Sequence, residues 1–339
     1  MKRKILFLFS GSRERILHEA RSGEGTDTAL RGMNHIPGAE YLIAPRGLIW
    51  SLFLIPRLLR FDIVIAQDEL FLGYVVSQCA RMFRFKTKWL YITMTSSTLI
   101  RRHATHPVRL FLFKQFWASY SRIICLSSEQ LEDLVQLGIA REHLVFVPFG
   151  IDAQFFQPAS EPHEENLIVS VGRDAGRDYK TLFRAAEHTK HSFVVVASKR
   201  NIPLDISTPS NISVLYDQPL TEVRDLYAHA WLVVVPSKDA SVSDGSDCSG
   251  QTVILDALAA GKAVIATRRS WIADYFVPGQ DLVVIEPNDS EALARAINEL
   301  WGDEGKQSRL AESGQAKVVA HYTTKAFAKA LLLMIDSVT

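Results

Sequence analysis

Short apolar runs alternate with longer segments of helical periodicity along the first half of the chain. The runs of strand length lie at residues 5–9, 63–66, 89–94, 122–126 and 144–148. Strands that alternate with helix-length segments are typical of a parallel sheet with helices on both faces. We therefore predict that the first half folds as a Rossmann-like domain.

The second half of the chain repeats this rhythm. Its strand-length runs lie at residues 167–171, 193–197, 231–236, 263–267 and 282–285. Between the halves, residues 152–166 are polar, contain two prolines and lack apolar periodicity, which is typical of an interdomain linker. The pattern predicts an α/β protein with two doubly wound, Rossmann-like domains that face a central crevice. The predicted boundaries are 1–152 for the first domain, 153–165 for the linker, 166–322 for the second domain and 323–339 for a last helix that packs back on the first domain.

Composition adds limits to this picture. A chain of 339 residues with 47% hydrophobic content is long enough to bury two cores. The apolar runs at 5–9 and 48–56 are too short for a bilayer span, and the first lacks a signal-peptide cleavage site, so we expect neither. The three cysteines, Cys79, Cys125 and Cys248, fit neither a disulfide framework nor a zinc site, which favours a reducing, cytoplasmic compartment.

The net charge of +1 hides an asymmetry between the two halves. Residues 1–152 carry 20 Lys and Arg against 13 Asp and Glu, and the remainder carries 18 against 24. No acidic residue lies between Glu69 and Glu129, whereas nine cations do: Arg81, Arg84, Lys86, Lys88, Arg101, Arg102, Arg109, Lys114 and Arg122. Such a block attracts anions.

Aromatic residues alternate with the cations between residues 101 and 122. This pattern indicates either a helix that lies on an anionic membrane or a core-packing helix with a basic outer face. The first interpretation makes a lipid-linked acceptor and a peripheral position on the inner face of the membrane plausible. Nucleic acid ranks last as a partner, because no nucleic-acid-binding motif accompanies the charge.

The segment 249–267 has the strongest chemical pattern, which predicts a loop, a helix, a glycine stop and a strand. Gly250 allows close approach of a ligand to the backbone, and the free N–H groups of Gln251 and Thr252 at the helix start favour a phosphate. Asp256 lies one turn further on, where a carboxylate accepts hydrogen bonds from ribose hydroxyls. A solvated helix residue is an equally good interpretation of Asp256.

Three cations follow the strand predicted at 167–171. Arg173, Arg177 and Lys180 lie where α/β folds bind ligands, and they would neutralise a diphosphate leaving group. A solvated basic loop is the plain alternative. Gly11, directly after the first predicted strand, is either a donor contact or a tight strand-to-helix turn.

Taken together, these passages resemble the family 4 glycosyltransferases and their relatives with the GT-B fold. The resemblance spans nearly the whole chain as an ordered set of motifs, which lies at residues 147–152, 171–173 with Lys180, 236–237, 256–267 and 286–300. It implies a retaining transfer of a sugar from a UDP or GDP sugar to an acceptor hydroxyl, possible targets being lipid-linked or cell-surface glycan precursors. It also implies no essential cofactor or metal.

The resemblance assigns roles to residues of this sequence. Arg173 and Lys180 would act on the leaving diphosphate, with Arg177 competing with Lys180, and Asp256 would contact the ribose. Cys248 replaces the first glutamate of the paired-acid motif, so Asp244, Asp247 or the backbone amides of 250–252 would compensate for it.

A second departure is the family histidine that follows the strand at 89–94, which is replaced here by Thr95-Ser96-Ser97. Two other functions therefore stay open. One is a nucleotide-sugar epimerase, and the other is a non-catalytic subunit that binds sugar nucleotides.

Overall fold

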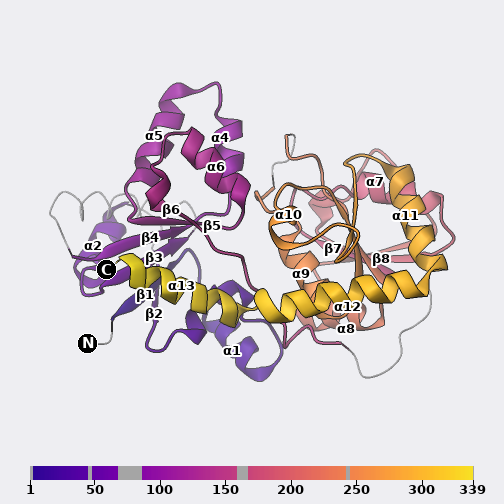
Figure 1. The fold of residues 1–339 in the computed structure, drawn as a ribbon, viewed down its shortest axis with the longest axis horizontal. Coiled ribbons are helices and arrows are strands. Elements are labelled where there is room, and N and C mark those ends of the chain that lie inside the picture. The colour runs from indigo at the N-terminus through magenta and orange to yellow at the C-terminus, as the bar shows by residue number, and fades with distance from the viewer. Residues whose placement is uncertain (1–2, 45–47, 68–85, 159–166, 242–244, 339) are drawn as a thin grey trace. The chain divides into compact units, whose positions relative to one another are not determined.

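The computed structural model describes residues 3–44, 48–67, 86–158, 167–241 and 245–338 (Figure 1). Asp244, Cys79, Arg81 and Arg84 lie outside the described residues. The chain divides into two compact units. Unit 1 contains Met1–His18, Asp27–Phe149 and Thr324–Thr339, and unit 2 contains Glu19–Thr26 and Gly150–Thr323.

Unit 1 is built on a six-stranded parallel sheet in the order β2-β1-β3-β4-β5-β6. Its strands are β1 (Ile5–Phe9), β2 (Glu40–Ile43), β3 (Ile63–Gln67), β4 (Lys88–Ile92), β5 (Arg122–Cys125) and β6 (Leu144–Phe146). Its described α-helices are α1 (Glu14–Ser22), which runs on into unit 2, α2 (Leu48–Leu58), α4 (Ser96–Arg102), α5 (Pro107–Ala118), α6 (Ser128–Gln136) and α13 (Thr324–Val338). Strands β1 and β3 are buried along their whole length, as expected for a sheet covered on both faces.

Unit 2 repeats this architecture with the strand order β12-β11-β10-β7-β8-β9. Its strands are β7 (Leu167–Gly172), β8 (Ser192–Ala197), β9 (Ile212–Tyr216), β10 (Leu232–Val235), β11 (Ala263–Thr267) and β12 (Val283–Ile285). Its other helices are α7 (Tyr179–Glu187), α8 (Leu220–His229), α9 (Gln251–Ala259), α10 (Ile272–Tyr275), α11 (Ser290–Gly302) and α12 (Glu304–His321). Asp178 and Asp289 cap α7 and α11, because their side chains accept hydrogen bonds from the first-turn N–H groups of Thr181 and Ala292.

The predicted fold class is confirmed, since both sheets are parallel and doubly wound. The ten strands expected from apolar runs are all present, with ends that differ by up to two residues. Two strands were missed, β2 and β9. Both lie at an edge of their sheet, and neither is covered along its length: β2 has no fully buried residue, and β9 has only one, Ile212. They therefore lack the long buried run that marks the inner strands.

The strand order places a switch point in each sheet. In unit 2 the chain proceeds outward from β7 through β8 to β9, and then crosses back to β10 on the other side of β7. Ligands of open α/β sheets bind at the carboxyl ends of the strands where this reversal occurs. The carboxyl ends of β7 and β10 are therefore where the fold of unit 2 favours a ligand.

The predicted linker contains buried residues. Phe155 and Phe156, within the predicted linker, are buried, and the ring of Phe156 packs against Tyr227 of α8 with centroids 5.7 Å apart. Within the described parts of the chain, no helix is both long and apolar enough to cross a bilayer.

Candidate functional site

A buried arginine lies between the carboxyl ends of β7 and β10. Arg177 pairs with Ser237 in an antiparallel bridge, and its Nη1 donates to Ser237 Oγ at 3.4 Å. The side chain runs across Gly172, the last residue of β7, where a Cβ atom would lie 1.9 Å from Arg177 Nε. Only 4% of Arg177 is exposed, and its Nε has no hydrogen-bond partner among the described residues. A buried cation with an unused donor is a strong site for an anion.

The start of α9 meets this arginine. Gly250 precedes the helix with φ of 92°, a conformation that glycine adopts without strain. A Cβ atom on Gly250 would lie 3.1 Å from Arg177 Nη1, so the guanidinium is next to the first turn of α9. The free N–H groups of a helix start and a guanidinium both favour a phosphate. Gln251 is buried and Thr252 is exposed at this turn.

Two polar atoms on α9 lack a partner among the described residues. They are Gln251 Nε2 and Asp256 Oδ1, both shielded from solvent. Burial raises the pKa of Asp256 well above its usual value, and the nearby charge of Asp152 raises it further. Buried polar groups without partners are rare in native proteins and call for an explanation such as a ligand. An amide donor and a carboxyl group both suit the hydroxyl groups of a sugar or ribose.

Asp174 fastens the loop that leads into α9. Its carboxylate accepts hydrogen bonds from the N–H of Gly176 at 2.8 Å, the N–H of Ser246 at 3.2 Å and the hydroxyl of Ser249 at 2.9 Å. Burial acts to raise the pKa of Asp174, but these hydrogen bonds and the charge of Arg177 outweigh it, so the pKa is lowered. The ionised carboxylate therefore holds residues 245–249 in place.

The side chain of Arg269 supports the same loop by binding backbone carbonyl groups. Its Nη1 donates to the carbonyl of Lys238 and its Nη2 to the carbonyl of Asp247, each at 3.0 Å. Arg269 and Asp247 are both buried, and Cys248, where the family motif has a glutamate, is 8% exposed. The loop before α9 is thus held on two sides.

The two residues predicted to be catalytic lie at the surface of unit 2. Arg173 is about half exposed, and its guanidinium donates to the carbonyl of Gln218 at 2.6 Å and lies 3.7 Å from Asp217. Lys180 forms an exposed ion pair with Asp205. Of the two cations that compete for the second position, Arg177 is the one that contacts the start of α9. The catalytic roles of Arg173 and Lys180 stay predictions.

Gly11 belongs to unit 1, at the switch point between β1 and β3. Its carbonyl accepts a hydrogen bond from Arg13 Nη1 at 3.2 Å, and a Cβ atom would meet only that nitrogen at 3.7 Å. Its predicted contact with the donor stays a prediction.

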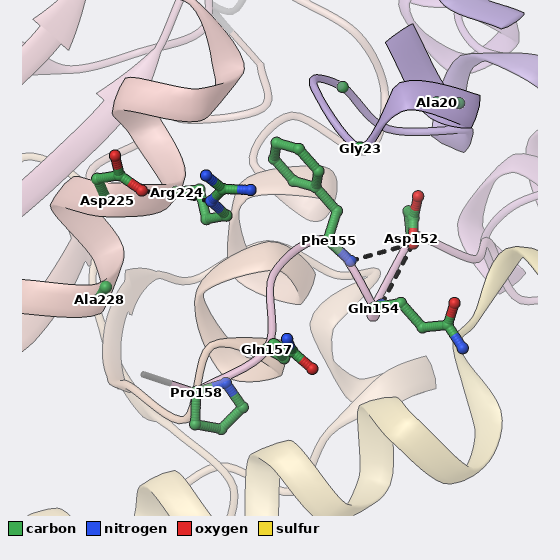
Figure 2. Close-up of a pocket in the computed structure, with 11 residues that line it drawn as sticks. Ala20, Gly23, Asp152, Gln154, Phe155, Gln157, Pro158, Arg224, Asp225 and Ala228 are labelled. Atoms are coloured by element: carbon green, nitrogen blue, oxygen red, sulfur yellow. Dashed lines mark hydrogen bonds and ion pairs between the residues drawn. The ribbon is translucent and has the colours of Figure 1, made fainter. Parts of the chain in front are cut away.

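A separate cavity of about 590 Å³ lies on another part of unit 2 (Figure 2). It is lined by α8, by residues 152–158 and by part of the segment 20–25. Figure 2 shows the guanidinium of Arg224 next to the ring of Phe155, 4.9 Å from its centroid. None of the residues predicted to bind the donor lines this cavity, although Asp152, which raises the pKa of Asp256, does.

Sequence reasoning missed the roles of Asp174 and Arg269. An aspartate two residues before a glycine is a signal for a turn in which the side chain accepts the backbone N–H, and this signal was present at Asp174. No local signal marks Arg269, because its partners lie 22 and 31 residues away in the sequence. Among the described residues, no group of three or more His, Cys, Asp or Glu side chains is arranged to hold a metal ion.

Two family models match consecutive parts of the chain. The model of glycosyl transferases group 1 matches residues 152–317, and that of Glycosyltransferase Family 4 matches residues 8–155. Among curated proteins, the lipopolysaccharide core biosynthesis glycosyltransferase LpsE of Rhizobium meliloti (strain 1021) is 24% identical over 252 residues, 70% of this chain and 69% of that protein. The O-antigen chain mannosyltransferase C of Escherichia coli is 28% identical over 231 residues, 62% of this chain and 59% of that protein.

Solved structures with a similar fold cover nearly the whole chain. Anabaena Alr3699/HepE in complex with UDP and glucose has a TM-score of 0.75 at 16% identity, over 99% of this chain and 100% of that one. Sucrose-phosphate synthase from Thermosynechococcus elongatus has a TM-score of 0.69 at 16% identity, over 99% of each chain. At this level of identity the likeness concerns the fold.

Proposed function

Because this chain belongs to the family 4 glycosyltransferases and has their GT-B fold, we propose that it is a retaining enzyme whose donor site is built around α9. The donor is a nucleoside-diphosphate sugar, and the acceptor is a hydroxyl of a lipid-linked glycan precursor. The observation that carries the proposal is the buried guanidinium of Arg177 at the start of α9, a helix on which two polar atoms have no partner among the described residues.

The diphosphate takes the position between Arg177 and the first turn of α9. Transfer breaks the bond between the anomeric carbon and the diphosphate oxygen while the acceptor oxygen bonds to that carbon, and the proton of the acceptor hydroxyl passes to the leaving diphosphate. Negative charge builds up on the leaving diphosphate, and a fixed guanidinium with the positive end of a helix stabilises it without reorganisation. These groups fill the role that a metal ion has in other transferases, which supports metal-independent transfer.

Arg173 is the second cation proposed for the diphosphate. It lies at the end of β7 and would exchange the carbonyl of Gln218 for a phosphate oxygen. Lys180 would first have to leave its ion pair with Asp205, so Arg177 is the better-placed partner of Arg173.

Asp256 and Gln251 bind the hydroxyl groups of the donor in this proposal. Occupation of the site would supply partners for Asp256 Oδ1 and Gln251 Nε2, which have none in the part of the chain that the structure describes. The base of the donor nucleotide is either uracil or guanine in this proposal. Structures of similar fold contain UDP or UDP-glucose, and one relative is named a mannosyltransferase, which supports a hexose as the sugar.

The acceptor class follows from the relatives. The two curated proteins act in lipopolysaccharide core biosynthesis and on the O-antigen chain according to their names. We therefore propose a glycan precursor at the cytoplasmic face of the membrane. Cys248 favours one alternative, a subunit that binds sugar nucleotides without turnover, because it removes a carboxylate from the motif.

The test is a transfer assay with purified protein, UDP- and GDP-hexoses and lipid-linked glycan acceptors. The expected result is acceptor-dependent release of one nucleoside diphosphate and a product with the anomeric configuration of the donor. Arg177→Met should lower kcat by about a hundredfold or more, the scale of one lost donor to a developing oxyanion. Arg295→Gln, at an exposed position of α11, is the control and should leave kcat unchanged.

Three outcomes contradict parts of this proposal. A product with inverted configuration rules out retention. Conversion of the donor sugar without any acceptor indicates an epimerase, and binding without turnover on every acceptor indicates the non-catalytic subunit.

A further inference from the structure

Helix α5 of unit 1 is anchored to the sheet through one face. Phe116 and Trp117 are buried, and Phe116 packs edge-on against Tyr91 of β4 with ring centroids 5.3 Å apart. Phe113, one turn earlier, stacks on Trp117 at 5.6 Å. These contacts fix the orientation of the helix.

The opposite face of α5 exposes large apolar side chains. Val108 is 72% exposed, Phe111 59% and Leu112 56%. Their spacing of three and four residues places them on the same side of the helix. No other helix in the described part of the chain exposes more than one large apolar side chain. A contiguous apolar face of this kind marks a contact surface, whereas single exposed apolar residues do not.

Cations border this face. Arg109 of α5 and Arg102 at the end of α4 are both exposed. Glu129 and Asp133 of α6 lie 3.3 and 3.9 Å from the guanidinium of Arg101. The segment from residue 70 to 128 contains no acid of its own. The border of the apolar face is therefore positively charged.

We propose that α5 docks this protein on an anionic lipid surface. Val108, Phe111 and Leu112 enter the boundary between headgroups and acyl chains, and Arg102 and Arg109 pair with headgroup phosphates. An interfacial helix of this composition buries its apolar face by about 5 to 10 Å. The charge decides the occupant, because a second copy of the chain docked by the same face would bring its arginines against those of the first.

The first test is binding of the full chain to lipid vesicles without donor or acceptor. Vesicles of phosphatidylcholine alone are compared with vesicles that also contain phosphatidylglycerol. We expect binding to the anionic vesicles only, falling as salt rises, because exposed charges are screened. Since no transfer reaction is measured, the outcome is independent of the proposed function.

Substitutions separate the apolar from the charged contribution. The double substitution Phe111→Ser and Leu112→Ser should weaken vesicle binding by about tenfold or more, from the loss of buried apolar area. Arg102→Gln with Arg109→Gln should remove most of the preference for anionic lipid. Leu204→Ser, at a position that is 98% exposed, is the matched apolar control and should bind like the wild type.

Insertion of α5 into the lipid can also be measured directly by fluorescence. Tryptophan fluorescence of the variant Phe111→Trp should shift to shorter wavelength on anionic vesicles and be quenched by brominated acyl chains. Equal binding of the wild type to both vesicle types would overturn the proposal, as would unchanged binding of the Phe111→Ser, Leu112→Ser variant. A dimer in solution that this variant dissociates would assign the face to a second copy instead.

Discussion

At the scale of single residues, Asp256 links stability to ligand binding. In the unfolded chain its carboxyl group ionises with a pKa of about 4, whereas in the folded protein burial and Asp152 hold the pKa well above that value. Between these two pKa values the folded protein retains a proton that the unfolded chain has lost. The free energy of unfolding therefore falls as pH rises through this window.

Asp256→Asn should stabilise the protein for this reason. We expect a gain of about 1 kcal/mol near pH 7 that vanishes towards pH 4, measured by thermal unfolding across the pH range. Asp225→Asn, at an exposed position of α8, serves as the control, with no gain at either pH. An equal gain at both pH values would show that the charge of Asp256 is not the cause.

Gly250 tests the contact between Arg177 and α9. Gly250→Ala places a Cβ atom at positive φ and 3.1 Å from both Arg177 Nη1 and Val235 Cγ1. We expect a loss of about 1 to 3 kcal/mol in unfolding free energy, together with weaker nucleotide binding, measured by denaturant titration and calorimetry. Gly302→Ala, where a Cβ atom meets nothing within 4 Å, should change neither.

At the scale of elements, the loop before α9 depends on one carboxylate. Asp174→Ala removes three hydrogen-bond acceptor contacts, with Gly176, Ser246 and Ser249. Amide exchange in residues 245–249 should accelerate, and donor affinity should fall by about tenfold, because each lost bond to a charged group contributes about 1.5 to 3 kcal/mol to local order.

Asp205→Ala is the matched control for this loop. Asp205 pairs with Lys180 at the surface, where an ion pair contributes little. If both variants weakened donor binding equally, the effect would not be specific to the loop held by Asp174, and its proposed role in donor binding would be wrong.

The elements also show where sequence reasoning ends. Strands β1 and β3 were predictable because their residues are buried on both faces and so form continuous apolar runs. Edge strand β9 was not, because Ser213, Leu215 and Tyr216 are exposed and only Ile212 is buried. The pattern of glycine, glutamine and aspartate in α9 pointed to the helix start, but the burial of Arg177 beside it depends on tertiary packing, as does the exposure of Arg173.

At the scale of the whole molecule, the last helix stabilises the unit that begins the chain. Phe327 of α13 packs against Phe149 with ring centroids 5.7 Å apart, and the backbone of Ala328 lies against Gly32. Phe327→Ala should cost about 3 to 5 kcal/mol, the scale of a buried phenylalanine. Hydrogen exchange should show the loss in unit 1, with the sheet of unit 2 protected as before.

Leu333→Ala gives the comparison on the same helix. Leu333 is 64% exposed, so its truncation should leave the exchange of unit 1 unchanged. Equal loss of protection in both units after Phe327→Ala would contradict the assignment of α13 to unit 1.

The whole-molecule architecture could be predicted because alternating apolar runs and helical segments repeat in both halves of the chain. The assignment of residues 19–26 could not. Residues 19–26 belong to unit 2 although they are surrounded in sequence by unit 1, and this depends on packing between distant segments. The family motifs added the reaction type, which neither periodicity nor charge provides.

The most direct test of the donor site is calorimetric titration of the protein with UDP and with GDP. Wild type and Asp256→Ala are compared, with Asp225→Ala as the control. We expect that one of the two nucleotides binds and that Asp256→Ala loses about 1 to 3 kcal/mol of binding free energy, the scale of leaving a buried polar group of the ligand without its hydrogen-bond partner. Failure of both nucleotides to bind, or equal binding to wild type and Asp256→Ala, would contradict a donor site at α9.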